Sequence, residues 1–166
     1  MDNKLLVGLS SIGAQQAAPT KCTNEAINQL LNYDYSAIYP ACGILYRSRN
    51  MVLWAHSDAG YYSESKSQSR AVAHIFLSEN DPNPRWSSPG LTLAQIIILL
   101  MSSASEVELG ALFITAQDMV AMRNTLEEMK WPQPKLPIQP DNSSAAGVVN
   151  NNIPPRKLKT MNRRLH

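Results

Sequence analysis

The residues of this sequence that are best suited to chemistry are a few carboxylates next to apolar segments. Asp58 closes an apolar stretch that begins at Met51, and Asp141 follows a second, shorter one. In open α/β sheets, ligand sites gather at the ends of strands, where a side chain projects into a crevice. Aspartate is also a common turn residue after a strand, so these two positions alone are compatible with ordinary turns.

A further carboxylate comes from the stretch MSSASEVELGALF, which holds both Glu106 and Glu108. Because they are two residues apart, their side chains diverge by roughly 200° on a helix, and only one can face a given site. Ser103 with Glu106 fits a capping box, and Ser105 with Glu108 fits one as well. Alternatively, both glutamates simply occupy the first helical turn, where the helix dipole favours negative charge. The local pattern leaves this choice open.

Two strand-end carboxylates and one helix carboxylate form a set of oxygen ligands of the kind that Mg²⁺ prefers. Two such ions about 4 Å apart hold the attacking and leaving oxygens of a phosphoryl displacement. No Asp or Glu follows Asp141, and the last eleven residues contain five cations, namely Arg156, Lys157, Lys159, Arg163 and Arg164. A basic segment of this kind binds polyanions, although a solvated terminus can have the same composition. Carboxylates and basic segment together predict hydrolysis of a nucleic acid.

A sheet and a helix must position these carboxylates, and the sequence pattern predicts both. Alternating apolar residues predict strands at 51–58 and 69–78, and the run 91–103 favours a buried strand over a core helix. Apolar residues at steps of three and four predict a helix over 105–130. The other predicted elements are a helix at 24–38 capped by Thr23, a strand at 43–48, a strand ending on Asp141, a helix capped by a serine at 143, and a last helix in the basic segment. This order predicts a mixed α/β fold.

The composition indicates a globular protein of one domain with an appended segment, since 44% of the 166 residues are hydrophobic and 17% are charged. The longest apolar run, 96–101, is far shorter than the ~20 residues that span a bilayer. Cys22 and Cys42 lack metal-ligand spacing, which predicts reduced thiols in a cytosolic protein. His56 and His74 are predicted to be core or edge residues rather than ligands. No signal peptide is recognisable, so the protein is expected not to be secreted.

Four ordered stretches resemble the ribonuclease H region of copia-type retrotransposon polyproteins. They are AHSDAGYYSE, SRAVAHIFLS, MSSASEVELGALFITAQ and PIQPDNSSAAGVVNN. That family has a His-Ser-Asp-Ala strand, then a helix that starts Ser-Ser-x-x-Glu-x-Glu, then a strand that ends Thr-Asp-Asn. The stretch GLSSIGAQQAAPTKCTNEAINQLLNY resembles the segment that connects the polymerase of such reverse transcriptases to ribonuclease H. The resemblance therefore runs over nearly the whole chain.

The resemblance implies a ribonuclease H-like fold over 51–166, a mixed five-stranded sheet flanked by helices, behind a connection segment over 1–50. It implies a hydrolase that uses Mg²⁺, or Mn²⁺ in its place, to cut the RNA strand of RNA–DNA hybrids during reverse transcription. Asp58, Glu108 and Asp141 match the metal-binding carboxylates, and Glu108 is preferred because ELGA fits the family pattern. A polymerase domain of the same polyprotein would be a partner, in the cytoplasm, in virus-like particles, or in the nucleus. The five basic residues would contact backbone phosphates.

Three features depart from the family pattern. Asn162 falls where the family has a fourth catalytic carboxylate, and an amide brings no negative charge to a second ion. Pro140 replaces the usual threonine before Asp141 and removes a backbone donor from a strand. The sequence stops at His166, inside the last predicted helix, which predicts a C-terminally truncated domain. An active ribonuclease H and a catalytically inactive remnant with weak nucleic-acid binding are therefore both open, and an integrase-like or resolvase-like nuclease is disfavoured by the segment 1–50.

Overall fold

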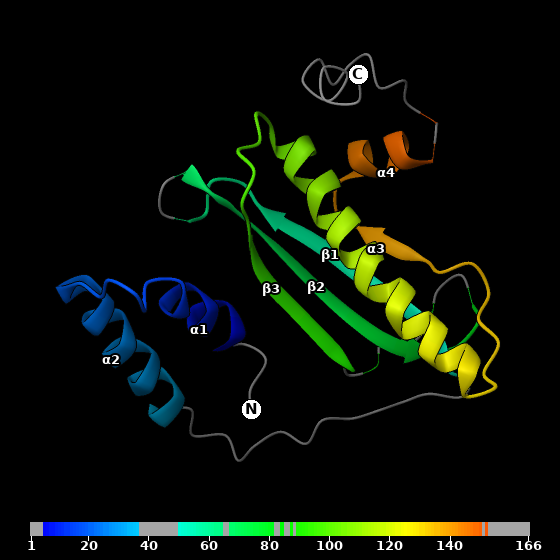
Figure 1. The fold of residues 1–166 in the computed structure, drawn as a ribbon, viewed down its shortest axis with the longest axis horizontal. Coiled ribbons are helices and arrows are strands. Elements are labelled where there is room, and N and C mark those ends of the chain that lie inside the picture. The colour runs from blue at the N-terminus through cyan, green and yellow to red at the C-terminus, as the bar shows by residue number, and fades with distance from the viewer. Residues whose placement is uncertain are drawn as a thin grey trace. The chain divides into compact units, whose positions relative to one another are not determined.

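The structure is a computed structural model that describes residues 5–36, 50–64, 67–81, 84, 87, 89–150 and 152. The chain divides into two compact units, Met1–Ile44 and Leu45–His166 (Figure 1). The strand predicted at 43–48 and the helix predicted in the basic segment lie outside the described residues. Within the described part of the chain, no helix combines the length and apolar character that crossing a membrane would require.

The first unit contains two helices, α1 (Leu6–Gly13) and α2 (Lys21–Ser36). The amide of Thr23 donates to Thr20 Oγ1 over 3.2 Å, and the amide of Thr20 donates to Thr23 Oγ1 over 3.0 Å. This reciprocal pair satisfies two amides that a helix start leaves without partners. The prediction of Thr23 as the N-cap is therefore wrong. Thr20 caps the helix, and Thr23 lies inside the first turn, where its buried side chain completes the pair.

The second unit is built on a four-stranded mixed sheet with the order β3-β2-β1-β4. The strands are β1 (Val52–Gly60), β2 (Ser69–Ser78), β3 (Leu91–Ile97) and β4 (Ile138–Pro140). β2 is antiparallel to both β1 and β3, whereas β4 is parallel to β1. The predicted mixed sheet flanked by helices is confirmed. The prediction of five strands is wrong for the described residues, which form four, and the strand predicted at 43–48 lies outside them.

The ambiguous run 91–103 is a strand as far as Ile97, so that prediction is confirmed for its first half. β3 pairs with β2 from Leu91 opposite Ile75 to Ile97 opposite Ser69. Ser69 is the first residue of β2, so beyond Ile97 the chain has no partner strand. The side chain of Ile98 is 84% exposed, and the following residues lead into a helix.

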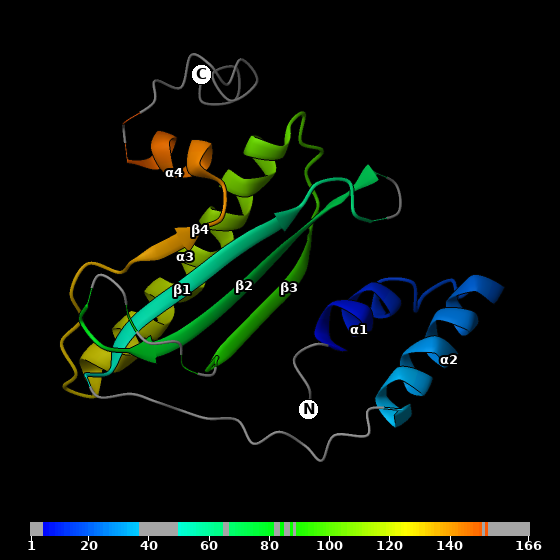
Figure 2. The ribbon, with the colours of Figure 1, turned by 180° about the vertical axis from the view of Figure 1, so that it is seen from behind.

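One long helix, α3 (Ala104–Glu128), covers one face of the sheet, as the two opposite views in Figures 1 and 2 show. The main core lies between them, where Leu53, Ala55 and Ile75 of the sheet cluster with Met119 and Leu126 of the helix. Alternate residues of a strand face the same side, which explains why Leu53 and Ala55 are both buried. Full burial of one large aliphatic side chain contributes about 1.5–3 kcal/mol.

The short helix α4 (Ser143–Val149) follows β4 and packs on α3. Its N-cap is Asn142, whose Oδ1 accepts from the amides of Ser144 and Ala145 over 2.9 Å and 3.3 Å. The predicted serine cap at 143 is wrong, because Ser143 is already helical. An asparagine at this position reaches the free amides of the first turn as well as a serine would.

Candidate metal centre

Three carboxylates from three elements meet at one corner of the second unit. Asp58 of β1, Glu108 of α3 and Asp141 after β4 each offer an oxygen, and these oxygens all lie within 4.8 Å of one another. Asp58 and Asp141 are exposed, whereas Glu108 is only 5% exposed. The structure therefore brings together the three carboxylates that the sequence analysis singled out, with one beneath the surface and two at it.

The parallel pairing of β1 with β4 sets the two aspartates side by side. Ser57 pairs with Pro140, and in each case the residue that follows is an aspartate. Asp58 is not at the strand end as predicted, because β1 continues to Gly60 and Asp58 still pairs with Val72 on the β2 side. On the β4 side Asp58 has no partner strand among the described residues, because β4 ends at Pro140. The end of β4 leaves a crevice beside Asp58, and α/β sheets place ligands in crevices of this kind.

The start of α3 decides which glutamate joins the aspartates. Ser103 is the N-cap, and its Oγ accepts from the amide of Glu106 over 3.2 Å. The Glu106 side chain turns back and accepts from the amide of Ser102 over 2.7 Å. The predicted pairing of Ser103 with Glu106 is therefore confirmed for the bond to the Ser103 side chain, whereas the return bond of Glu106 goes to the amide of Ser102 instead of that of Ser103. These two bonds hold Glu106 at the helix start and leave Glu108 available for the carboxylate cluster.

Two tyrosines after β1 attach the loop that precedes α3. The hydroxyl of Tyr61 donates to the carbonyl of Ser102 over 3.3 Å, and that of Tyr62 donates to the carbonyl of Met101 over 3.1 Å. Their rings stack with centroids 4.0 Å apart. Since this loop ends at the N-cap of α3, the tyrosines of the motif DAGYY link the strand that carries Asp58 to the helix that carries Glu108.

A second link joins β1 to α3 in the core. The hydroxyls of Ser57 and Thr115 hydrogen-bond over 3.2 Å, and Thr115 also bonds to the carbonyl of Ala111 over 2.8 Å. Ser57 and Thr115 are 2% and 1% exposed. Because Ser57 directly precedes Asp58, this buried contact fixes the distance between the helix and the strand next to the carboxylates.

Glu108 is in an environment that opposes its own charge. Burial and, after it, the negative charges of Asp141 and Asp58 together raise the pKa of Glu108 from 4.5 to about 7. Its Oε2 atom is buried and has no hydrogen-bond partner among the described residues. An unpaired buried carboxylate oxygen is costly, and a cation next to it removes that cost. The all-oxygen donor set is of the kind that hard divalent cations prefer.

Two histidines that the sequence analysis set aside lie beside the carboxylates. His56 and His74 face each other across β1 and β2, and both line a hollow of about 310 Å³ together with Asp58 and Asp141. His56 stacks on Phe76 with centroids 5.4 Å apart, and burial followed by the charge of His74 lowers the pKa of His56. Strand alternation was the available signal, because residues two apart share a face and His56 is two residues before Asp58.

The remaining predicted site residues lie outside the described part of the chain. These are Asn162 and the five basic residues Arg156, Lys157, Lys159, Arg163 and Arg164. Their proposed contacts with a metal or with phosphates therefore stay predictions.

Comparison with family models, with curated proteins and with solved structures gives no match for this chain. The fold and the site define a class all the same: a mixed α/β protein with a cluster of three carboxylates that could hold a metal ion. The chemistry that such a site performs has to be argued from its geometry.

Proposed function

We propose that this chain is a ribonuclease H-like nuclease that hydrolyses the RNA strand of RNA–DNA hybrids. The observation that carries the proposal is the convergence of Asp58, Glu108 and Asp141, with ligand oxygens within 4.8 Å of one another. It is supported by the position of the cluster, where β4 ends beside β1 and α3 begins. The ordered sequence motifs that resemble copia-type ribonuclease H contain the same three residues.

Asp58, Glu108 and Asp141 would hold Mg²⁺, or Mn²⁺ in its place. Bound divalent cations in such a site activate a water and stabilise the leaving oxygen of a phosphodiester. Asp58 Oδ1 accepts from the amide of Ala59 over 2.7 Å, which orients this exposed carboxylate. Glu108, with a pKa of about 7, has to release a proton to bind a cation, so metal affinity rises as the pH rises through neutrality.

The proposed substrate is a hybrid duplex whose RNA strand is distinguished by its 2′-hydroxyls. The basic residues from Arg156 to Arg164 would bind backbone phosphates and so position the duplex without reading its sequence. In this proposal the chain belongs to the reverse transcriptase polyprotein of a retroelement, with a polymerase domain as its partner. It would act in the cytoplasm, in virus-like particles, or in the nucleus.

A catalytically inactive remnant of the same fold is the second candidate, and Asn162 is the residue that favours it. An amide at the position of a fourth carboxylate supplies an oxygen but no charge, which weakens the hold on a second ion. Pro140, which removes a backbone donor from a strand, gives little support to the inactive remnant. In the described residues β4 has only β1 as a neighbour, and prolines are tolerated in strands at a sheet edge.

The test is cleavage of an end-labelled RNA–DNA hybrid by the full chain in Mg²⁺ and in Mn²⁺. We expect cleavage that falls at least about 100-fold in Asp58→Asn, because a ligand that stabilises the transition state by several kcal/mol is lost. The matched control is Asp118→Asn on α3, outside the carboxylate cluster, which should retain full activity.

The two candidates give different results in this assay. An inactive wild-type chain that gains cleavage on Asn162→Asp is a remnant silenced at its fourth ligand. A folded chain that cuts neither before nor after that substitution, in either metal, would rule out the nuclease proposal.

A further inference from the structure

Two exposed aromatic side chains follow directly after β1, the strand that carries Asp58. Tyr61 and Tyr62 are 38% and 47% exposed, and their rings stack on each other with centroids 4.0 Å apart. Each ring covers one face of the other, so the surface that the rings expose lies on the outside of the pair. Tyr61 comes three residues after Asp58, which keeps their α-carbons within about 11 Å of each other.

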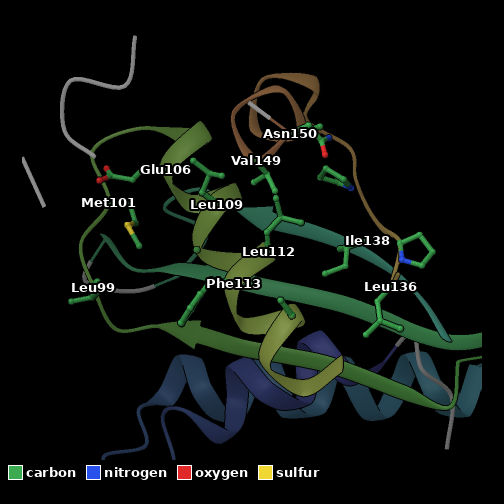
Figure 3. Close-up of a pocket in the computed structure, with 15 residues that line it drawn as sticks. Leu99, Met101, Glu106, Leu109, Leu112, Phe113, Leu136, Ile138, Val149 and Asn150 are labelled. Carbon is green, nitrogen blue, oxygen red and sulfur yellow. The ribbon is translucent and has the colours of Figure 1, made fainter. Parts of the chain in front are cut away.

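Both rings are fixed at their hydroxyl ends, which donate to the carbonyls of Ser102 and Met101. The amide of Tyr62 in turn donates to Oγ of the buried Ser69 over 3.2 Å. Met101 is itself packed, and Figure 3 shows it close to Glu106, in the lining of an apolar groove of about 720 Å³ between α3, α4 and β4. The ring pair is therefore anchored to the folded core, and a ligand that contacts it has little side-chain motion to arrest.

The backbone of Tyr62 is in a conformation that a bulky residue rarely adopts. Its φ of 50° lies in the left-handed region, where a side chain is strained and glycine is not. Strained residues of this kind gather at binding and catalytic sites, where the surrounding structure holds them in place. Exposure, fixation and strain at one aromatic pair close to the metal centre are together the features of a surface that contacts a ligand.

We propose that Tyr61 and Tyr62 form a stacking subsite for one unpaired base of the nucleic-acid substrate. An aromatic ring needs an open base face, and inside a duplex both faces of a base are covered by its neighbours, so the stacked base is unpaired. Nucleotides follow one another at about 3.4 Å along a duplex, so this base lies within about three nucleotides of the phosphodiester at the carboxylates. The inference rests on the proposed function and names its preferred substrate, a hybrid with an unpaired nucleotide near the cleaved bond.

Binding of the full chain to fluorescein-labelled RNA–DNA hybrids, followed by anisotropy in Ca²⁺, tests the subsite. Ca²⁺ accepts the same oxygen ligands in a looser geometry and serves as a non-catalytic stand-in for Mg²⁺. We expect a hybrid with one unpaired RNA nucleotide to bind at least about fivefold more tightly than the fully paired hybrid, because a stacked base is gained. An abasic residue at the unpaired position keeps the backbone and should remove this gain. In Mg²⁺, cleavage should concentrate within about three nucleotides of the unpaired base.

Matched variants separate the rings from their hydroxyl groups. The double variant Tyr61→Leu, Tyr62→Leu should lose the gain in binding, whereas Tyr61→Phe, Tyr62→Phe should keep it. Both double variants lose the hydroxyl hydrogen bonds, but only the second keeps the rings. Trp131→Leu removes a similarly exposed aromatic residue beyond the other end of α3 and should keep the gain as well.

Three results would overturn the inference. They are equal binding of both hybrids by the wild type, a gain that survives the abasic substitution, and a gain that a folded phenylalanine variant loses as fully as the leucine variant. The proposed hydrolysis fails separately. A base-dependent gain in binding without cleavage in Mg²⁺ or Mn²⁺ would keep the subsite and remove the hydrolysis, whereas cleavage of hybrids without that gain would do the reverse.

Discussion

Gln133 and Glu108 lie near opposite ends of β1, and both are buried, with 7% and 5% of their surface exposed. The Gln133 side chain accepts from the amide of Leu53 over 3.0 Å and donates to the carbonyl of Met51 over 2.9 Å. The same side-chain amide also donates to the carbonyl of Trp131 over 3.3 Å. Glu108, by contrast, keeps one buried oxygen without a hydrogen-bond partner among the described residues, beside two further carboxylates.

This is the difference that we expect between a polar group with a structural role and one that binds a cation. Gln133 satisfies the backbone where β1 begins, so its burial lowers the energy of the folded chain. Once it has lost its proton, Glu108 raises that energy as long as no cation is present, because its buried negative charge lies next to Asp58 and Asp141. A costly buried group of this kind is expected where a protein binds a ligand, which is the physical basis for proposing a metal site at this end of β1.

The largest stability effect that we expect comes from Glu108→Gln. The pKa of Glu108 is 4.5 ordinarily and about 7 in the folded protein, so between these values the folded state holds a proton that the unfolded state has released. The metal-free wild type therefore loses stability as the pH rises through this window, by about 3 kcal/mol once the pH exceeds 7. Urea unfolding in a chelator should show Glu108→Gln to be more stable than the wild type above pH 7, by up to that amount, with the gain vanishing at acidic pH.

Glu127→Gln is the matched control for this prediction, on the same helix. Glu127 is 39% exposed and pairs with Arg123 over 2.8 Å. Its substitution should change stability by less than about 0.5 kcal/mol, because exposed ion pairs contribute little. A Glu108→Gln variant less stable than the wild type above pH 7 would mean that Glu108 is structural, and the contrast with Gln133 would disappear.

The next effect in size should come from the opposite end of β1. Gln133→Met keeps the length of the side chain but leaves the amide of Leu53 and the carbonyl of Met51 without their partner. We expect a loss of about 2–3 kcal/mol in the free energy of unfolding, since each unsatisfied buried group costs about 1–3 kcal/mol. Denaturant unfolding measures it, with the exposed Gln139→Met as a control that should stay within about 0.5 kcal/mol of the wild type. Equal losses in both variants would remove the structural role assigned to Gln133.

The smallest effect should be stabilisation by metal. A cation that binds only the folded state at ten times its Kd adds about 1.4 kcal/mol. Thermal unfolding at pH 7.5 should therefore show a higher Tm in Mg²⁺ or Mn²⁺ for the wild type and no shift for Asp58→Asn. The Gln133→Met variant should keep the full metal-dependent shift, because its defect lies away from the carboxylates. A shift that persists in Asp58→Asn would place metal binding elsewhere in the chain.

Local periodicity was enough to predict several elements from the sequence. Alternation predicted β1 and β2, although β1 continues two residues beyond the predicted end at Asp58, and a spacing of three and four predicted most of α3. Helix caps were predicted less well, because Thr20 and Asn142 compete with neighbours of similar chemistry and the choice depends on which backbone amides are free. The sheet has four strands in the described residues rather than five, a count that no local pattern determines.

The sequence by itself determined which carboxylates were available to a site, since Asp58 and Asp141 follow from residue type and position along the chain. Its local pattern left Glu106 and Glu108 both open, and only the resemblance favoured Glu108. Only the tertiary structure decided that Asp58, Glu108 and Asp141 meet. The parallel register of β1 with β4 sets the aspartates side by side, and the packing of α3 on β1 brings Glu108 to them. The raised pKa of Glu108 and the hydrogen bonds of Gln133 to the start of β1 arise in the same way. All of these depend on contacts between residues far apart in the chain, and such contacts set burial and charge proximity, which a sequence pattern does not encode.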